Sequence, residues 1–135
     1  MTLRKVLCTG AAVAAMATAA IAATAGPAQA DNGDGAVACN SGEICFWRYN
    51  GAVLWTKQFW RAADHAGYTW YAGGTTSVRV QDDAVDVTNK DTECRVRVGN
   101  YLGNGNWSWD YIPNDYLRKD LVNAHNKNDY HDRCN

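Results

Sequence analysis

The sequence lacks a surplus of charge of one sign, and it lacks the usual spacings of metal-binding residues. Its 135 residues include 13 Lys and Arg against 14 Asp and Glu, and no basic stripe runs along the chain. Because nucleic-acid-binding proteins neutralise phosphates with clustered Lys and Arg, we expect no nucleic-acid partner. No Cys-x-x-Cys pair occurs, and His65, His125 and His131 show no zinc-binding spacing. We therefore expect no metal and no cofactor.

Catalytic motifs are lacking as well. The chain has no nucleophile elbow, no metal-binding helix motif and no glycine-rich phosphate loop. His125 and His131, with Asp129 and Asp132 nearby, are the residues best placed in the sequence to form an acid–base group. They lie in a polar stretch near the C-terminus, where solvated side chains are the ordinary interpretation. We therefore predict that the protein is not an enzyme.

Charge is scarce in residues 1–30, which hold only Arg4 and Lys5. An alanine-rich apolar run follows, and the Ala-Gln-Ala sequence at residues 28–30 fits a small-x-small cleavage site. This order predicts a secretory signal peptide over residues 1–30 and a secreted, extracellular, monomeric domain over residues 31–135. A membrane anchor is the alternative, but the small residues and Gly26-Pro27 at the end of the run disfavour it. The mature part has 11 basic and 14 acidic residues, a net charge of about −3.

Aromatic residues are abundant in the mature part, which holds all six Trp, all seven Tyr and both Phe. Such a density argues against disorder, because a few large rings can build a core. Apolar residues alternate with other residues in several short segments, at 44/46, 78/80, 85/87 and 96/98. This period of two predicts an all-β fold of antiparallel strands with one buried face. Only residues 117–124 are compatible with a helix, of one or two turns.

The mature part holds four cysteines, because Cys8 belongs to the predicted signal peptide. An even number in a small exported chain predicts two disulfides, for which three pairings are possible. Cys39 and Cys45 flank a turn-forming Asn-Ser-Gly stretch, which favours a local bridge between them. Cys94 and Cys134 would then close a loop of about 40 residues, which stabilises the fold by roughly 4 kcal/mol in the chain-entropy model.

An internal repeat with an offset of 52 residues runs through the mature part. The offset superimposes six pairs of similar residues: Ile44 and Val96, Phe46 and Val98, Tyr49 and Tyr101, Gly51 and Gly103, Trp55 and Trp107, Phe59 and Tyr111. A strand that ends in Tyr-x-Gly can fold back as a hairpin, with the glycine at positive φ. We therefore predict two similar β-modules, about 39–80 and 94–134, packed as a β-sandwich and joined by an acidic loop over 81–93. Trp55 and Trp107 are expected in the core.

The doubled pattern, apolar-x-apolar-x-x-Tyr-x-Gly, resembles the Greek-key motif of βγ-crystallins. Together with the signal peptide, the mature length and the cysteine layout, the chain is similar to the secreted bacterial peptidase inhibitors typified by the Streptomyces metalloproteinase inhibitor. The resemblance spans Cys39 to Cys134. It implies two Greek-key modules packed as a sandwich, and the disulfides Cys39–Cys45 and Cys94–Cys134.

The resemblance also implies a function and a site. In this family the bond after the central half-cystine is presented to an extracellular metalloprotease, and here that bond is Cys94–Arg95. The protease-facing loop would consist of Asp91, Thr92, Glu93, Cys94, Arg95 and Val96. Arg95 departs from the bulky apolar residue that thermolysin-like enzymes favour after the cut. A trypsin-like enzyme, which selects a basic residue before the cut, would instead cleave between Arg95 and Val96; a subtilisin-like enzyme is a third possible target.

A βγ-crystallin-type binding module, possessing weak calcium or cell-wall carbohydrate binding and an antimicrobial role, is the alternative function. Calcium sites of that superfamily need paired Asn or Asp and two hydroxyls. The first stretch has Thr76-Ser77 but Ala72-Gly73 in place of the acids, and the second has Asn114-Asp115 but Arg118-Lys119 in place of the hydroxyls. For a sugar-stacking surface, Trp60, Trp70 and Trp109 remain open candidates.

Overall fold

The computed structural model describes residues 38–134, so the predicted signal peptide lies outside the described residues. The described part is all-β, as the sequence predicts, with two antiparallel sheets, no α-helix and one 3₁₀ turn, η1 (His65–Gly67). None of the helical structure within it is long and apolar enough to cross a membrane. Both predicted disulfides are confirmed, Cys39–Cys45 and Cys94–Cys134.

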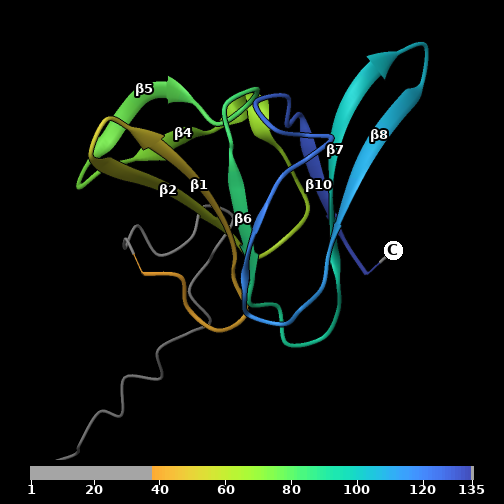
Figure 1. Ribbon diagram of the computed structural model, residues 1–135, viewed down its shortest axis with the longest axis horizontal. Coiled ribbons are helices and arrows are strands. Elements are labelled where there is room, and N and C mark those ends of the chain that lie inside the picture. The colour runs from red at the N-terminus through yellow and green to blue at the C-terminus, as the bar shows by residue number, and fades with distance from the viewer. Residues whose placement is uncertain (1–37, 135) are drawn as a thin grey trace, which may run out of the picture.

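Six strands form the larger sheet, in the order β5-β4-β2-β1-β6-β9, and four form the smaller, in the order β3-β10-β7-β8 (Figure 1). The larger sheet consists of β1 (Ile44–Asn50), β2 (Val53–Phe59), β4 (Thr69–Tyr71), β5 (Thr75–Arg79), β6 (Asp86–Asn89) and β9 (Arg118–Asp120). The smaller sheet consists of β3 (Ala63–Asp64), β7 (Val96–Gly103), β8 (Asn106–Ile112) and β10 (Tyr130–Arg133).

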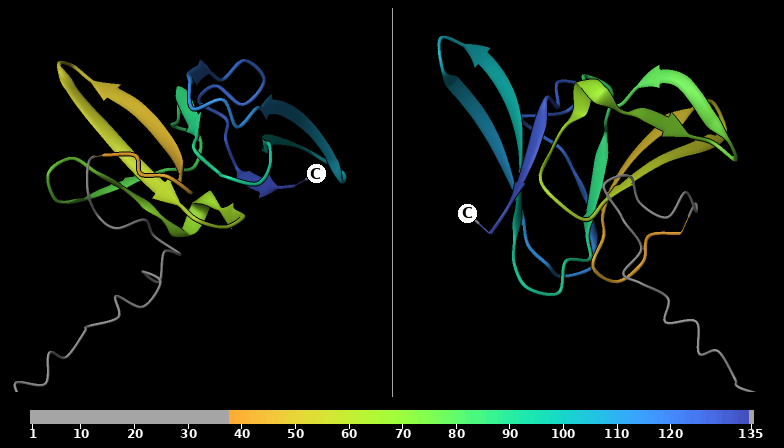
Figure 2. Two further views of the ribbon diagram at one scale, coloured as in Figure 1. Left: turned by 90° about the horizontal axis from the view of Figure 1, so that it is seen from below. Right: turned by 180° about the vertical axis from the view of Figure 1, so that it is seen from behind.

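Each sheet contains one strand from the other half of the chain. Strand β3 pairs with β10, and β9 pairs with β6. As a result β6 and β10 have equivalent surroundings, since each also pairs with the first strand of its own half, β1 or β7. Residues 44–89 hold strands β1 to β6, residues 96–133 hold strands β7 to β10, and residues 90–95 join these two halves (Figure 2).

The core lies between the two sheets. Ile44 and Phe46 of β1 and Val96 and Val98 of β7 are fully buried in one hydrophobic cluster, which also includes residues of β2, β6 and β8. These four residues are the alternating apolar positions of two of the four predicted segments, so the strand periodicity is confirmed there. In the other two segments Val80 and Val85 lie just outside β5 and β6. Burying each such side chain contributes about 1.5–3 kcal/mol.

The repeat is confirmed in the first strand of each half and shifted in the second. Gly51 and Gly103 both have a positive φ, 62° and 88°, at the turns of the β1–β2 and β7–β8 hairpins. Leu102, however, is an extra residue in β7, because Tyr101 pairs with Trp107 and Gly103 already pairs with Asn106.

This bulge makes the predicted equivalence of Trp55 and Trp107 wrong. Trp55 lies opposite Arg48, whereas Trp107 lies opposite Tyr101 and is 37% exposed. Trp107 therefore belongs to the surface, and the expected core position is corrected.

Strand β6 lies inside the segment that the sequence predicts as a loop, 81–93, and reduces the connection to residues 90–95. Its Asp86 is buried and accepts a hydrogen bond from Arg118 Nε at 2.8 Å, so a charged residue is accommodated in a central strand. Arg118 itself lies in β9, within the segment 117–124 that the sequence makes compatible with a short helix. Pairing with β6 overrides that weak local preference.

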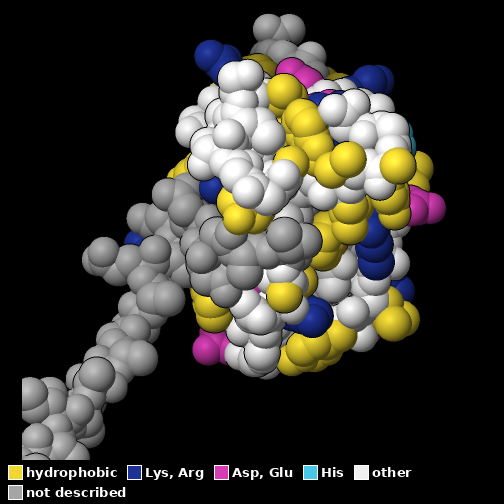
Figure 3. All heavy atoms as spheres, turned by 90° about the vertical axis from the view of Figure 1, so that its left-hand side faces the viewer, with side chains coloured by type: hydrophobic (Ala, Val, Ile, Leu, Met, Phe, Trp, Pro, Cys, Tyr) yellow, Lys and Arg dark blue, Asp and Glu magenta, His cyan; other side chains and the backbone are white. Residues whose placement is uncertain are grey.

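The end of the molecule that carries the β1–β2 hairpin and β5 has a mixed surface (Figure 3). Hydrophobic side chains gather there in separate groups, and Lys and Arg side chains are dispersed between them. On the described part of this face the basic residues form no continuous area.

Candidate functional site

Residues 90–95 cross from β6 in the larger sheet to β7 in the smaller one, at the lower end of the molecule in Figure 1. The structure exposes three residues of the predicted loop, Thr92, Glu93 and Arg95. Cys94 is half-buried, whereas Asp91 and Val96 are fully buried. The surface that another protein can contact is therefore a short tip between two buried residues.

Asp91 holds the N-terminal side of this tip. Its Oδ1 accepts a hydrogen bond from Glu93 N at 2.8 Å, and its Oδ2 forms an ion pair with Arg133 Nε. Arg133 also donates from Nη1 to Trp60 O at 2.9 Å. Burial raises the pKa of Asp91, but the hydrogen bonds from Arg133 and Glu93 outweigh burial and hold the pKa below its ordinary value. The carboxylate is thus a charged structural group that fixes the loop to β10.

Asn89, at the end of β6, organises the loop from the inside. It is fully buried, and its Oδ1 accepts from Asp91 N at 2.9 Å. Its Nδ2 donates to Cys94 O and to Ile112 O, both at 3.1 Å. A single amide side chain therefore ties the two ends of the loop to each other and to β8.

The Cys94–Arg95 bond is supported on both sides. Cys94 is joined to Cys134 by the disulfide, and its carbonyl faces the Asn89 amide. Arg95 O accepts a hydrogen bond from Cys134 N at 3.1 Å, directly before β7 begins. The Arg95 guanidinium lies 5.3 Å from the centre of the Tyr111 ring, which keeps the side chain on the surface.

The calcium and sugar candidates have other environments. Asp115 Oδ2 lies 2.8 Å from Lys119 Nζ, so an ammonium occupies the place of a cation beside it. Trp70 is fully buried and donates from Nε1 to Asp83 Oδ2 at 2.8 Å. Trp60 and Trp109 are half-buried.

The histidines suggested as an acid–base group are not brought together. His125 is exposed, whereas His131 is fully buried and contacts His65, with 2.7 Å between His131 Nδ1 and His65 Nε2. His131 Nε2 lies 2.7 Å from Arg61 O and must donate to it, so His131 Nδ1 accepts from His65 Nε2. Asn128 Nδ2 then donates to His65 Nδ1 at 2.7 Å. The expectation of a solvated His131 is wrong, since this chain of hydrogen bonds holds two neutral rings in the core.

Burial lowers the pKa of His65 to about 4, and burial together with the neighbouring His65 lowers the pKa of His131 well below its ordinary value. The pair is therefore neutral at pH 7. No sequence signal pointed to it, because 66 positions separate the two histidines. Asn89 and Arg133 were missed for a similar reason, since their partners are set by the fold.

No model of a known protein family, no curated protein and no solved structure matches this chain. The resemblance described from the sequence therefore stays a prediction.

Proposed function

We propose that this protein is a secreted peptidase inhibitor that presents the Cys94–Arg95 bond to an extracellular metalloprotease. The observation that carries the proposal is the double attachment of this bond. Cys94 is held by Cys134 and Asn89, and Arg95 is held by Cys134 N and by the start of β7. Two disulfides in a small domain support an extracellular location.

The topology supports the same family. In the larger sheet β6 returns to lie beside β1, which gives the order β4-β2-β1-β6 of a Greek key. The second half repeats this return with β10 beside β7. We infer two Greek-key modules of the βγ-crystallin type, each donating its third strand, β3 or β9, to the other sheet.

Attachment on both sides distinguishes an inhibitor from a substrate. Hydrolysis would add one water across the bond, leaving a carboxylate on Cys94 and an amine on Arg95. Neither new end is released, because the disulfide and the strands hold both pieces. Resynthesis of the bond then competes with dissociation, and the fixed loop reduces the ordering cost of binding the enzyme.

The Asn89 hydrogen bond slows the forward reaction. An attacking enzyme must polarise the Cys94 carbonyl, and that oxygen is already held by Asn89 Nδ2 on the interior side. Turning the carbonyl toward the enzyme leaves one of the two buried Nδ2 hydrogens of Asn89 without an acceptor, while the other still bonds to Ile112 O, at a cost of about 1–3 kcal/mol. This cost corresponds to a roughly 5- to 150-fold slower cleavage.

The surroundings of the Cys94–Arg95 bond favour a protease whose specificity depends on the residue that follows the cleaved bond, here Arg95. A protease that selects the residue before the cut would need the Cys94 side chain, which is bonded to Cys134. Cleavage after Arg95, as a trypsin-like enzyme requires, falls at Val96, which is buried in β7 and paired with Ile112 of β8. A metalloprotease with a pocket for the exposed Arg95 side chain therefore fits best.

The test is inhibition by the mature protein of thermolysin-, trypsin- and subtilisin-type enzymes, followed by intact mass. We expect inhibition of the metalloprotease with a gain of one water in part of the protein. Replacing Arg95 by Val should strengthen inhibition of a thermolysin-like enzyme about tenfold, since burying Val in its apolar pocket gains about 1–2 kcal/mol. Arg79→Val, at an exposed arginine of β5, is the matched control and should change nothing. Inhibition of no enzyme by either protein would refute the proposal.

A further inference from the structure

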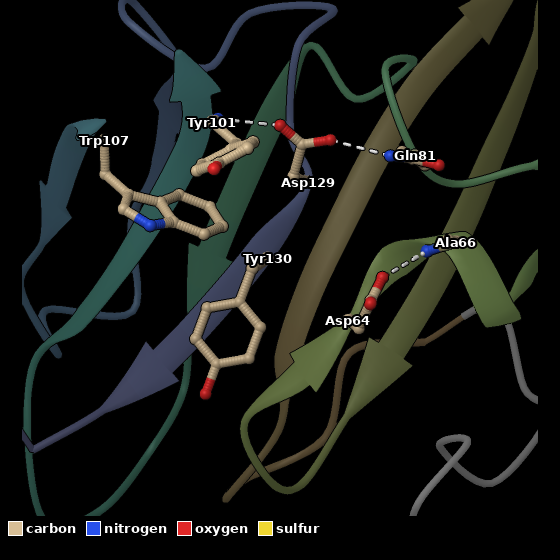
Figure 4. A pocket seen from close by; sticks show the side chains of 7 residues that line it. All are labelled: Asp64, Ala66, Gln81, Tyr101, Trp107, Asp129 and Tyr130. Carbon is tan, nitrogen blue, oxygen red and sulfur yellow. Dashed lines mark hydrogen bonds between the residues drawn. The ribbon is translucent and has the colours of Figure 1, made fainter. Parts of the chain in front are cut away.

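A cavity of about 460 Å³ opens between the two halves of the chain, at the far end of β7 from the loop. It is lined by Asp64, Ala66, Gln81, Tyr101, Trp107, Asp129 and Tyr130 (Figure 4). Tyr101 is five residues along β7 from Val96, about 17 Å at the rise of a strand. The cavity is thus separate from the proposed protease-facing loop.

Trp107 forms the floor of the aromatic side. Its ring stacks on Trp109, with centroids 5.1 Å apart and planes 19° apart, and Arg97 lies 4.2 Å from the Trp109 ring on β8. Gly99 makes this stack possible, because a Cβ there would come within 2.6 Å of Trp109 and 2.8 Å of Trp107. The absence of a side chain at Gly99 therefore leaves room for the Trp107 indole to lie on the sheet with part of its surface exposed.

Two tyrosine rings flank Trp107 at an angle, so that the three rings together form a concave surface. The Tyr101 ring lies 5.1 Å from Trp107 at a tilt of 51°, and the Tyr130 ring lies 6.1 Å away at 61°. Figure 4 shows the three rings grouped on one side of the cavity, with Asp129 beside Tyr101 and Asp64 across from Tyr130. The π-faces of such rings are regions of negative electrostatic potential.

The two carboxylates are held in place by neutral groups. Asp129 accepts from Gln81 Nε2 and from Tyr101 N, both at 2.7 Å, and Asp64 accepts from Ala66 N at 2.8 Å. Among the residues within 38–134 that line the cavity none is Lys or Arg. Five aspartates elsewhere are ion-paired with Arg or Lys: Asp83, Asp86, Asp91, Asp115 and Asp132. The cavity therefore has carboxylates and aromatic faces without a cation of its own.

We propose that this cavity binds an organic cation, an ammonium or guanidinium group that packs on Trp107 and is neutralised by Asp64 and Asp129. A cation over an indole is attracted by the ring quadrupole, most strongly when the site is partly desolvated. The volume accommodates a group as large as an arginine side chain. A neutral sugar would also stack on Trp107, but it would leave both carboxylates without a counter-charge.

The experiment titrates the mature protein with choline, N-acetyl-arginine amide and a neutral N-acetylglucosamine oligomer, and follows tryptophan fluorescence and the Trp107 indole signal in NMR spectra. Both cations should shift these signals, with an affinity that falls as salt is added. The relative affinity of choline and the arginine derivative distinguishes a free quaternary amine from a basic side chain as the natural source. The neutral oligomer should have no effect.

Two pairs of variants locate the site. Asp64→Asn removes the charge and keeps an oxygen for Ala66 N, so it should weaken cation binding about fivefold. Its matched control is Asp115→Asn, at an exposed aspartate that accepts from Leu117 N in the same manner and lies outside the cavity. Trp107→Ala should weaken binding about tenfold, whereas Trp55→Ala, which removes a half-buried indole in the other hairpin, should not.

Protease inhibition by Trp107→Ala should be unchanged, so failure of this proposal is distinguishable from failure of the proposed function. Binding of the neutral oligomer with no loss in Asp64→Asn would replace the cation site by a sugar surface and overturn the proposal. Lack of any shift with all three probes would also overturn it.

Discussion

Acidification should destabilise the fold through the buried histidine pair. His65 and His131 are surrounded by Phe46 and Phe59, whose ring centroids lie 4.7–5.6 Å from theirs. Every ring nitrogen of the pair is already engaged, so an added proton must break the hydrogen bond between the rings or the one from Asn128. A proton added at His65 Nδ1 would lose the hydrogen bond from Asn128 Nδ2 and could donate to Asn128 O, 3.2 Å away, but burial outweighs this gain and lowers the pKa of His65.

The magnitude follows from the pKa of His65. In the unfolded chain a histidine takes up a proton below about pH 6.5, whereas folded His65 does so only below about pH 4. Between these values the unfolded state holds more protons, so lowering the pH favours unfolding. The full difference is on the order of 3 kcal/mol, of which about 2 kcal/mol is lost between pH 7 and pH 5. His131, whose pKa is lowered as well, adds to this loss.

Thermal unfolding at pH 7 and pH 5 tests this reasoning. At about 4–8 °C per kcal/mol for a domain of this size, the midpoint should fall by roughly 10 °C. The range above pH 5 isolates the histidines, because Asp82 and Asp86 have pKa values raised by burial and act in the opposite direction at lower pH. The exposed His125, replaced by Asn, should leave the difference unchanged, and the double replacement His65→Leu with His131→Leu should remove it. An equal midpoint at both pH values, or an NMR titration of either buried ring near pH 6.5, would refute the argument.

Two further predictions concern the loop. Asn89→Ala should accelerate cleavage of the Cys94–Arg95 bond by a target protease, turning inhibition into turnover; Asn128→Ala, at another buried amide with backbone partners, controls for lost stability and should keep inhibition. Replacing Cys94 and Cys134 together by Ala should lower the free energy of unfolding by roughly 4 kcal/mol in a denaturant titration, since the bridge closes a 40-residue separation. That variant should also lose inhibition, and an inhibitor of undiminished potency without the bridge would contradict the proposed mechanism.

Sequence reasoning succeeded where the pattern is local. The alternation at Ile44 and Phe46 and at Val96 and Val98 identified the first strand of each half, and the Tyr-x-Gly pattern located both turns at Gly51 and Gly103. The short spacing of Cys39 and Cys45 likewise favoured the bridge that the structure contains.

Prediction from the sequence failed where the environment of a residue is determined by a partner that is distant in the sequence. A comparison at a constant offset of 52 residues cannot detect an inserted residue. The extra residue Leu102 shifts the β7–β8 register by one, so Trp107 does not occupy the position equivalent to that of Trp55. Asp86 led to the prediction of a solvated loop, because its charge has no partner nearby in the sequence. Its partner Arg118 is 32 positions away. The histidine pair and the Asn89 hydrogen bonds depend in the same way on which strands become neighbours.

The strand exchange between the two halves also determines when the fold can close. Strand β3 is stabilised by pairing with β10, so Ala63 must wait for His131, which lies 68 positions further along the chain. The hairpins β1–β2 and β7–β8 need only neighbouring residues and can form early, whereas each sheet is completed by contacts that span much of the described chain. Because long-range pairing is slow to form, folding should be limited by this final interlocking of the two halves.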